Sequence, residues 1–200
     1  DFGTVVNGVN QAIGLSGTVG HYRITYDSSL SGLYSVISQI IQITPGAPAA
    51  VTLENKSSLQ ISVVAGVALS TSPVLWVRDA AGNHITTDNI TTARVALISD
   101  PVVSDNIVAT SANFAAVNGV ITFADLNFVT TPDTGYRLKF TRTNGSTAVG
   151  DEVLSNALEI KHAPANRLEI VTQPSGAKSG ISMTSQPVLK VVDQYEIGRA

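Results

Sequence analysis

The chain has no cysteine. Disulfide-stapled scaffolds, thiolate metal sites and cysteine nucleophiles are therefore excluded. Charge is also scarce: Asp, Glu, Lys and Arg make up 14% of the residues, whereas ordinary folded domains carry about 25%. Ser, Thr, Asn and Gly fill the difference, a composition found in many extracytoplasmic β proteins.

Long apolar runs are missing too. No stretch approaches the roughly 20 apolar residues of a membrane-spanning helix, so we expect no membrane span in this segment. The net charge of −3 provides no electrostatic footprint for nucleic acid, and no nucleic-acid partner is predicted. Hydrophobic residues still make up 44% of the chain, which favours folded domains over a disordered polyelectrolyte.

Catalytic motifs are absent as well. The sequence contains neither a Gly-x-Ser-x-Gly elbow nor a glycine loop that would cradle a phosphate. His21, His84 and His162 stand far apart, and none has a partner at metal-ligand spacing. We therefore predict that the chain is not an enzyme and carries no cofactor, with calcium as a weak candidate ion.

What the chain does contain is a repeat of itself. The segment Pro73–Asp79 returns as Pro187–Asp193, with five of the seven positions identical. Tyr22 and Tyr136 are related by the same offset. A period of about 115 residues indicates an array of similar domains, which usually spans distance or presents surfaces rather than catalysing a reaction.

The phase of the repeat divides the chain into three segments. Residues 47–162 form a complete unit, residues 1–46 match only the later part of a unit, and residues 163–200 match only the early part. Because a partial domain cannot bury its apolar face, we expect the natural protein to continue in both directions. An Ala-Pro pair marks each seam, and the short linkers should limit bending between neighbouring units.

The local pattern predicts an all-β sandwich. Short β-branched runs bounded by Gly, Pro, Asn and Asp recur roughly every ten residues, and helical periodicity is scarcely present. In the complete unit we expect strands near residues 50–54, 59–64, 73–78, 92–98, 106–109, 112–117, 120–128, 136–142 and 152–160. Asn118 and Gly119 should form a hairpin turn, because both residues tolerate positive φ.

Alternation along residues 73–79 bears on the only tryptophan. Leu75 and Val77 share one face of the predicted strand, and Trp76 points to the other. The copy of Trp76 is Lys190, and a position that accepts both residues does not point into a packed core. Trp76 should lie at least partly on the surface, as a candidate for binding a sugar or a protein. Packing beneath a loop or against the neighbouring domain is the alternative.

Six stretches carry a family resemblance: 79–83, 118–126, 135–140, 168–176, 179–181 and 186–193. Together they resemble the immunoglobulin-like repeats of giant bacterial surface and secreted proteins. The resemblance implies tandem immunoglobulin-like Greek-key β-sandwich domains. It also implies an extracellular or bacterial cell-surface location and a role as stalk modules, as in adhesins, gliding-motility adhesins, S-layer proteins and long secreted enzymes.

The two copies depart from each other in two places. The first has Leu53-Glu54-Asn55-Lys56-Ser57 where the second has Thr172-Gln173-Pro174-Ser175, which leaves the register of the first strand open. After Asp193 the second copy reads as a longer hairpin than the one that follows Asp79.

Two tyrosines are predicted to have a structural role. Tyr22 and Tyr136 each open a strand shortly after a glycine. This is the arrangement of a tyrosine corner, in which the hydroxyl ties the strand to an adjacent loop. An exposed binding tyrosine is the alternative interpretation.

Three aspartates are weak candidates for a calcium site. Asp79, Asp88 and Asp105 lie in predicted loops, and calcium prefers oxygen ligands. Residues 79–83 lack the alternating acidic positions of a recognised calcium loop, and Asp followed by Gly-Asn is also typical of a tight turn. The turn is the favoured interpretation.

These observations predict a structural spacer segment of a long bacterial cell-surface or secreted repeat protein. One alternative is a module that binds a glycan or a protein through end loops or the face around Trp76. Another is a subunit of an extracellular filament or S-layer assembly, in which an incomplete unit accepts a strand from a neighbouring chain. The expected partners are neighbouring repeats of the same chain and, for the binding module, surface glycans or other cell-surface proteins.

Overall fold

The structure is a computed structural model of the chain. It describes residues 5–6, 9–10, 14–27, 34–99, 107–110, 113–144 and 147–199. Within these residues the chain is all-β, and helical structure is limited to one 3₁₀ turn, η1 (Lys56–Ser58). The predicted β-branched runs form strands in several sheets, because branched side chains fit a pleated, half-buried surface.

The larger sheet of the central segment, residues 47–162, is antiparallel except at one edge. Its order is β11-β10-β14-β15-β8, with β12 also paired to β10, and β15 and β8 run parallel. The strands are β8 (Ser62–Val64), β10 (Thr92–Ser99), β11 (Ile107–Thr110), β12 (Phe114–Ala115), β14 (Asp133–Asn144) and β15 (Thr147–Lys161).

The smaller sheet of this segment contains β7 (Ala50–Leu53), β9 (Val74–Arg78) and β13 (Val120–Thr122), with β9 in the middle. The predicted alternation on β9 is confirmed. Leu75 and Val77 are fully buried, whereas Val74, Trp76 and Arg78 are partly exposed. The inner face of this sheet therefore faces the core, and the outer face carries Trp76.

Both sheets contribute to one hydrophobic core. Leu75 and Val77 of the smaller sheet belong to the same buried cluster as Val95 and Phe140 of the larger one. Phe123 is fully buried in this cluster. Its ring centroid lies 4.8 Å from that of Phe114 and 5.1 Å from that of Phe140 in tilted arrangements, a geometry that aromatic rings prefer over face-to-face stacking. Two sheets around a shared core are compatible with a β-sandwich.

One expected strand is much shorter than predicted. The pattern over 120–128 predicts a continuous strand, but β13 ends at Thr122 and Asp125 adopts a positive φ of 56°. Leu126 and Phe128 are nevertheless buried. Apolar residues that anchor a loop in the core resemble a strand in sequence, because both are buried. They differ in the ladder hydrogen bonds of a sheet, which the hydrophobic pattern does not show.

The flanking segments contain small sheets of their own. Residues 1–46 hold β1 (Val5–Val6), β2 (Val9–Asn10), β3 (Gly20–Tyr22), β4 (Thr25–Tyr26), β5 (Val36–Ile37) and β6 (Ile41–Ile43), paired as β1-β2, β3-β6 and β4-β5. Residues 163–199 hold β16 (Ala165–Thr172), β17 (Val188–Asp193) and β18 (Gly198–Arg199), in the order β16-β17-β18.

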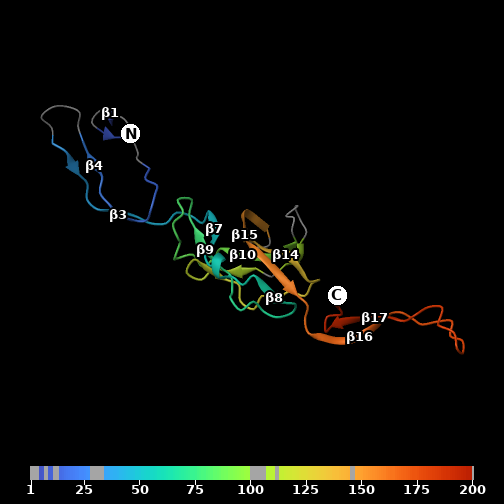
Figure 1. Cartoon of the computed structure of the whole chain (residues 1–200). Helices are drawn as coiled ribbons and strands as arrows, with labels where there is room; N and C mark the ends of the chain where they lie inside the picture. The colour runs from blue at the N-terminus through green and yellow to red at the C-terminus, as the bar shows by residue number, and fades with distance from the viewer. Residues whose placement is uncertain are drawn as a thin grey trace.

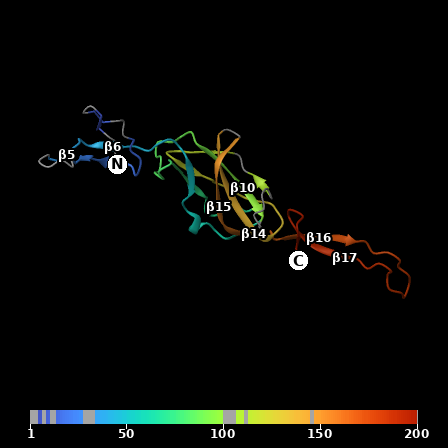
Figure 2. The same cartoon turned by 90° about the horizontal axis from the view of Figure 1, so that it is seen from above.

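The three segments follow one another along the molecule. Each strand pairing in the described residues joins strands of a single segment, 1–46, 47–162 or 163–199. In both views the first and last segments lie at opposite ends of the central one (Figures 1 and 2).

The structure resolves the register that the two copies left open. Val51 pairs with Val77 on β7 and β9, and Leu168 pairs with Val191 on β16 and β17. Since Val191 is the copy of Val77, Val51 corresponds to Leu168, and by the same pairing Leu53 corresponds to Ile170. Leu53 therefore does not correspond to Thr172.

The hairpin after Asp193 is not longer than its copy, and that interpretation was wrong. The N–H of Asp79 donates to Asn83 O and the N–H of Gly82 donates to Asp79 O. In the copy, the N–H of Asp193 donates to Ile197 O and the N–H of Glu196 donates to Asp193 O. The two turns therefore match residue for residue. The sequences look different because Glu196, with a φ of 66°, occupies the place of Gly82, with a φ of 84°.

Candidate functional site: the outer face around Trp76 and the Asp79 turn

The outer face of the smaller sheet centres on Trp76. Its neighbours across the two strand pairings are Thr52 of β7 and Val120 of β13. The side chain is partly exposed, and no further sheet among the described residues covers this side.

The Trp76 ring is held by its neighbours. The His84 ring stacks on it, with centroids 4.3 Å apart and an angle of 9° between the planes. The guanidinium carbon of Arg78 lies 5.3 Å from the Trp76 centroid, within the range of a cation–π contact. One face of the indole is therefore covered by His84, and any ligand of this surface would have to use the remaining exposed part.

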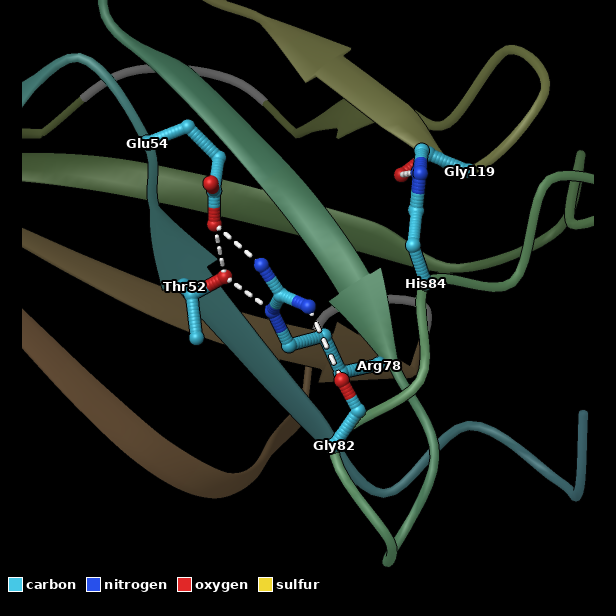
Figure 3. A network of polar contacts seen from close by, with 6 residues as sticks. All are labelled: Thr52, Glu54, Arg78, Gly82, His84 and Gly119. Atoms are coloured by element: carbon cyan, nitrogen blue, oxygen red, sulfur yellow. Dashed lines mark hydrogen bonds and ion pairs between the residues drawn. The ribbon is translucent and has the colours of Figure 1, made fainter. Parts of the chain in front are cut away.

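Arg78 organises the polar part of the same face (Figure 3). Its Nε donates to Thr52 Oγ1 at 2.7 Å, its Nη2 donates to Glu54 Oε1 at 2.9 Å and its Nη1 donates to Gly82 O at 2.8 Å. Thr52 also donates its hydroxyl to Glu54. Partial desolvation of Glu54 opposes its charged form, but the hydrogen bonds from Thr52 and Arg78 outweigh it and lower the Glu54 pKa.

The Asn118-Gly119 turn borders this surface. Its φ values are 52° and 75°, and Val117 and Val120 exchange backbone hydrogen bonds across it. The Gly119 carbonyl lies 3.1 Å from His84 Nε2, as Figure 3 shows. A Cβ on Gly119 would lie 2.1 Å from the Ile85 carbonyl oxygen, so glycine is required here for space as well as for φ.

The two predicted tyrosines tie their strands to the loops that precede them. The Tyr136 hydroxyl donates to Thr131 O at 2.8 Å, and the Tyr22 hydroxyl donates to Thr18 O at 2.8 Å. Tyr136 is buried in the core cluster, whereas Tyr22 in the first segment is exposed. The same local bond thus forms with and without a core around it.

Among the described residues of the central segment, Asp79 is the carboxylate with the most hydrogen bonds. Its Oδ1 accepts hydrogen bonds from the N–H groups of Ala81 and Asn83, at 2.9 and 2.8 Å. Its Oδ2 accepts one from the N–H of Gly46 at 2.9 Å, and the Asn83 amide donates to both oxygens. The Asn83 side chain and the Gly46 N–H are the main causes that lower the Asp79 pKa to about 2.

The Asp79 turn also reaches the preceding segment. The Asn83 amide nitrogen donates to Gly17 O at 2.8 Å, and its amide oxygen accepts a hydrogen bond from the N–H of Val19 at 3.0 Å. Asp79 and Asn83 therefore connect three parts of the chain: their own turn, the linker at Gly46 and the loop at 17–19.

The Asp88 side chain bonds within its own loop. Its carboxylate accepts hydrogen bonds from the N–H groups of Ile90 and Thr91 and from the Thr91 hydroxyl. Burial opposes the charged form, but these donors outweigh it and lower the Asp88 pKa. A calcium ion at Asp79 or Asp88 would have to displace such donors. Asp105, the third predicted calcium ligand, lies outside the described residues.

Within the part of the chain that the structure describes, no cluster of three or more His, Asp or Glu side chains could hold a metal ion. The histidines are on separate elements: His21 is on β3, His84 follows the Asp79 turn and His162 lies in the linker before β16. No helix among the described residues is long and apolar enough to cross a membrane.

Comparison with protein-family models and with curated proteins gives no match for this chain. The resemblance to immunoglobulin-like repeats therefore stays a prediction that depends on the motifs and on the geometry above.

The sequence did not predict the two contact residues between segments. These are Asn83, which bonds to the loop at 17–19, and Tyr195, which packs against the core of the central segment. Asn83 appeared only as part of a tight turn, and Tyr195 only as part of a longer hairpin. The available signal was the recurrence of Asp79 as Asp193 directly after the repeated strand. That recurrence identifies the turn, but only the folded chain shows what the turn touches.

Proposed function

We propose that this chain is a structural spacer segment of a long bacterial cell-surface or secreted repeat protein. In this proposal the repeat unit is an immunoglobulin-like Greek-key β-sandwich with a period of about 115 residues. The segment acts as an adhesin stalk, and the adhesins of this kind include gliding-motility adhesins.

One observation carries the proposal: the repeated sequence returns as repeated structure. Strands β9 and β17 each pair with the first strand of their segment in the same register, and each is followed by the same aspartate-led turn. A chain that uses one design repeatedly extends itself by one unit each time.

The connections between segments support a role in spanning distance. The linker from Thr44 to Pro48 contains two prolines, which restrict the backbone, and its Gly46 N–H is bonded to Asp79. Units joined by short, bonded linkers hold their ends apart better than units joined by free coils.

The decisive experiment is the unfolding of an excised unit, residues 47–162. If the unit is an independent domain, its single tryptophan, Trp76, and its far-ultraviolet circular dichroism should report one cooperative transition in urea. A polypeptide that is unfolded in buffer, or whose two signals change at different urea concentrations, contradicts the spacer proposal.

The location and the absence of catalysis belong to the same proposal. They are supported by the lack of cysteine, the low charge and the family resemblance. Protease treatment of intact producing cells tests the location: the segment should be removed from the surface while cytoplasmic proteins stay intact.

A second candidate function, a glycan- or protein-binding module, is favoured by Trp76. Its partly exposed ring lies beside the cationic Arg78, on a face that no other sheet in the described part of the chain covers. Trp76→Ala should abolish binding on a glycan array or in a pull-down, with Val120→Ala, its neighbour on the same face, as the matched control. Equal binding by both variants removes the support for this candidate.

A further inference from the structure

The contact between the first two segments has a counterpart between the second and the third. Asp193 Oδ1 accepts hydrogen bonds from the N–H groups of Tyr195 and Ile197, at 2.9 and 3.0 Å. Its Oδ2 accepts one from the linker N–H of Ala163 at 3.2 Å. Asp79 makes the equivalent bonds to Ala81, Asn83 and the linker residue Gly46.

The two carboxylate oxygens of each aspartate therefore accept hydrogen bonds from the same two parts of the chain. One oxygen orders the turn that follows the aspartate, and the other holds the linker that precedes the segment. Both aspartates are buried, with exposed fractions of 5% for Asp79 and 0% for Asp193. Hydrogen bonds from N–H groups to a carboxylate are stronger than those between neutral groups, and burial shields them from competing water.

The turn that the aspartate orders touches the preceding segment, but a different side chain makes the contact at each junction. At the first junction it is Asn83, through its bonds to Gly17 and Val19. At the second it is Tyr195, which packs against the core of the central segment and lies over Gly66.

The contact requires glycine at position 66. Its φ is 75°, and a Cβ built on it would lie 1.8 Å from the Tyr195 hydroxyl oxygen. Any other residue at position 66 would displace the ring. The end of the central segment thus has a cradle that accepts an aromatic side chain from the next segment.

We propose that the end of each unit is an interaction surface for the next unit of the same chain, with Asp79 and Asp193 as the positioning residues that lock linker and turn in one geometry. The partner is the aspartate-led turn of the following unit, which presents an amide or an aromatic side chain. This inference rests on the proposed function, in which units follow one another, and it adds that their mutual orientation is fixed.

The linker bond and the turn contact act together. A linker alone leaves the next unit free to rotate about its backbone bonds. A bond from the linker to Asp79, combined with bonds from Asn83 to the preceding loop, restrains the second segment at two separate points. Loss of Asp79 removes the first restraint directly and the second by releasing the turn.

The test uses the full chain with spin labels, which is straightforward because the protein has no native cysteine. Labels at Gln42→Cys and Thr122→Cys, both exposed strand positions in adjacent segments, report the distance between the first and second segments by pulsed electron paramagnetic resonance. We expect one narrow distance distribution that becomes about twofold broader in Asp79→Ala, as the linker approaches a free coil.

The matched control is Asp88→Ala. Asp88 is also a buried carboxylate with backbone donors, but all of its side-chain partners lie within residues 88–91. This variant should leave the distance distribution unchanged. Broadening in both variants would show general loosening of the central segment and would overturn the proposal.

A second pair of variants keeps the test valid if Asp79→Ala does not fold. Gly46→Pro removes the linker N–H, whereas Gly46→Ala retains it and places a Cβ at an ordinary 3.6 Å from the Asp79 Cβ. Broadening in Gly46→Pro alone supports the inference.

Narrow distributions in both Gly46 variants, or a broad one in the unsubstituted chain, overturn it. Either result would remove the support that the bonded linker gives to the spacer function, but that proposal is decided separately by the cooperative unfolding of residues 47–162.

Discussion

Strands β9 and β17 have nearly the same sequence, and each pairs with the first strand of its own segment, β7 or β16. The burial of their apolar side chains is nevertheless opposite. Leu75 and Val77 of β9 are 0% exposed, whereas Leu189 and Val191 of β17 are 53% and 38% exposed. The difference is what packs above them: the larger sheet covers β9, and no second sheet among the described residues covers β17. The strand pairing and the turn therefore form in both segments, whereas the buried face of β9 depends on the larger sheet.

The largest expected effect follows from this difference in burial. Leu75→Ala should destabilise the central segment by about 2–5 kcal/mol, because a fully buried leucine leaves a cavity, whereas Leu189→Ala should cost less than about 0.5 kcal/mol. Urea unfolding followed by far-ultraviolet circular dichroism, which reports the strands of every segment, measures both variants. Trp76, the only tryptophan, adds a fluorescence signal for the central segment alone. Similar losses from the two variants would mean that β9 and β17 are not energetically different.

A second comparison separates backbone strain from steric overlap. Gly82 and Gly119 both have positive φ, but a Cβ on Gly82 meets nothing within 4 Å, whereas one on Gly119 overlaps the Ile85 carbonyl. Gly82→Ala should cost about 1 kcal/mol and Gly119→Ala about 2–3 kcal/mol in thermal or urea unfolding. Equal costs would contradict the close approach of the hairpin turn to residue 85.

A third prediction concerns pH and compares Asp79 with its amide variant. The folded pKa of Asp79, about 2, lies below its ordinary value of 3.8. The unfolded chain therefore binds a proton first as the pH falls. The stability that Asp79 contributes is fully present above its ordinary pKa and is lost as the pH falls towards its folded pKa.

Thermal unfolding of wild type and Asp79→Asn between about pH 5 and pH 2 measures this contribution. The stability advantage of wild type should shrink steadily below about pH 4. A constant difference between the two proteins over this range would show that the carboxylate charge is not what holds the turn.

The smallest expected effect compares the ion pairs on the outer faces of the two strands. The Arg78 and Glu54 side chains are 23% and 27% exposed, whereas those of Lys190 and Glu169 are 40% and 43% exposed. A double-mutant cycle should give a coupling of about 0.5 kcal/mol for the first pair and about zero for the second. High salt should reduce the first value, and a larger coupling for Lys190 and Glu169 would reverse the comparison.

Much of the fold was predictable from sequence because the relevant signals are local. The alternation of Leu75, Trp76 and Val77 predicts the inner and outer faces of β9, and Asn118-Gly119 predicts a turn with two positive φ values. The long strand expected over 120–128 was wrong, because apolar loop anchors and strand residues share the same hydrophobic pattern.

The candidate site was less predictable. Trp76 was expected at the surface, but its stacking on His84 and its contact with Arg78 depend on how the Asp79 turn folds back over β9. The contacts of Asn83 with the loop at 17–19, and of Tyr195 with Gly66, join residues that are distant in sequence. No spacing rule brings such residues together.

The sequence by itself determined that this is a cysteine-free, all-β chain built on a repeated strand and turn, because alternation, turn residues and internal similarity are read directly from the order of residues. Only the tertiary structure decided that Leu75 and Val77 of β9 are buried beneath the larger sheet. It also decided that the turns after Asp79 and Asp193 are the same and that both contact the segment before them. The physical reason is that hydrogen bonds within a turn form between near neighbours, whereas a core or a contact between segments requires surfaces that only folding brings together.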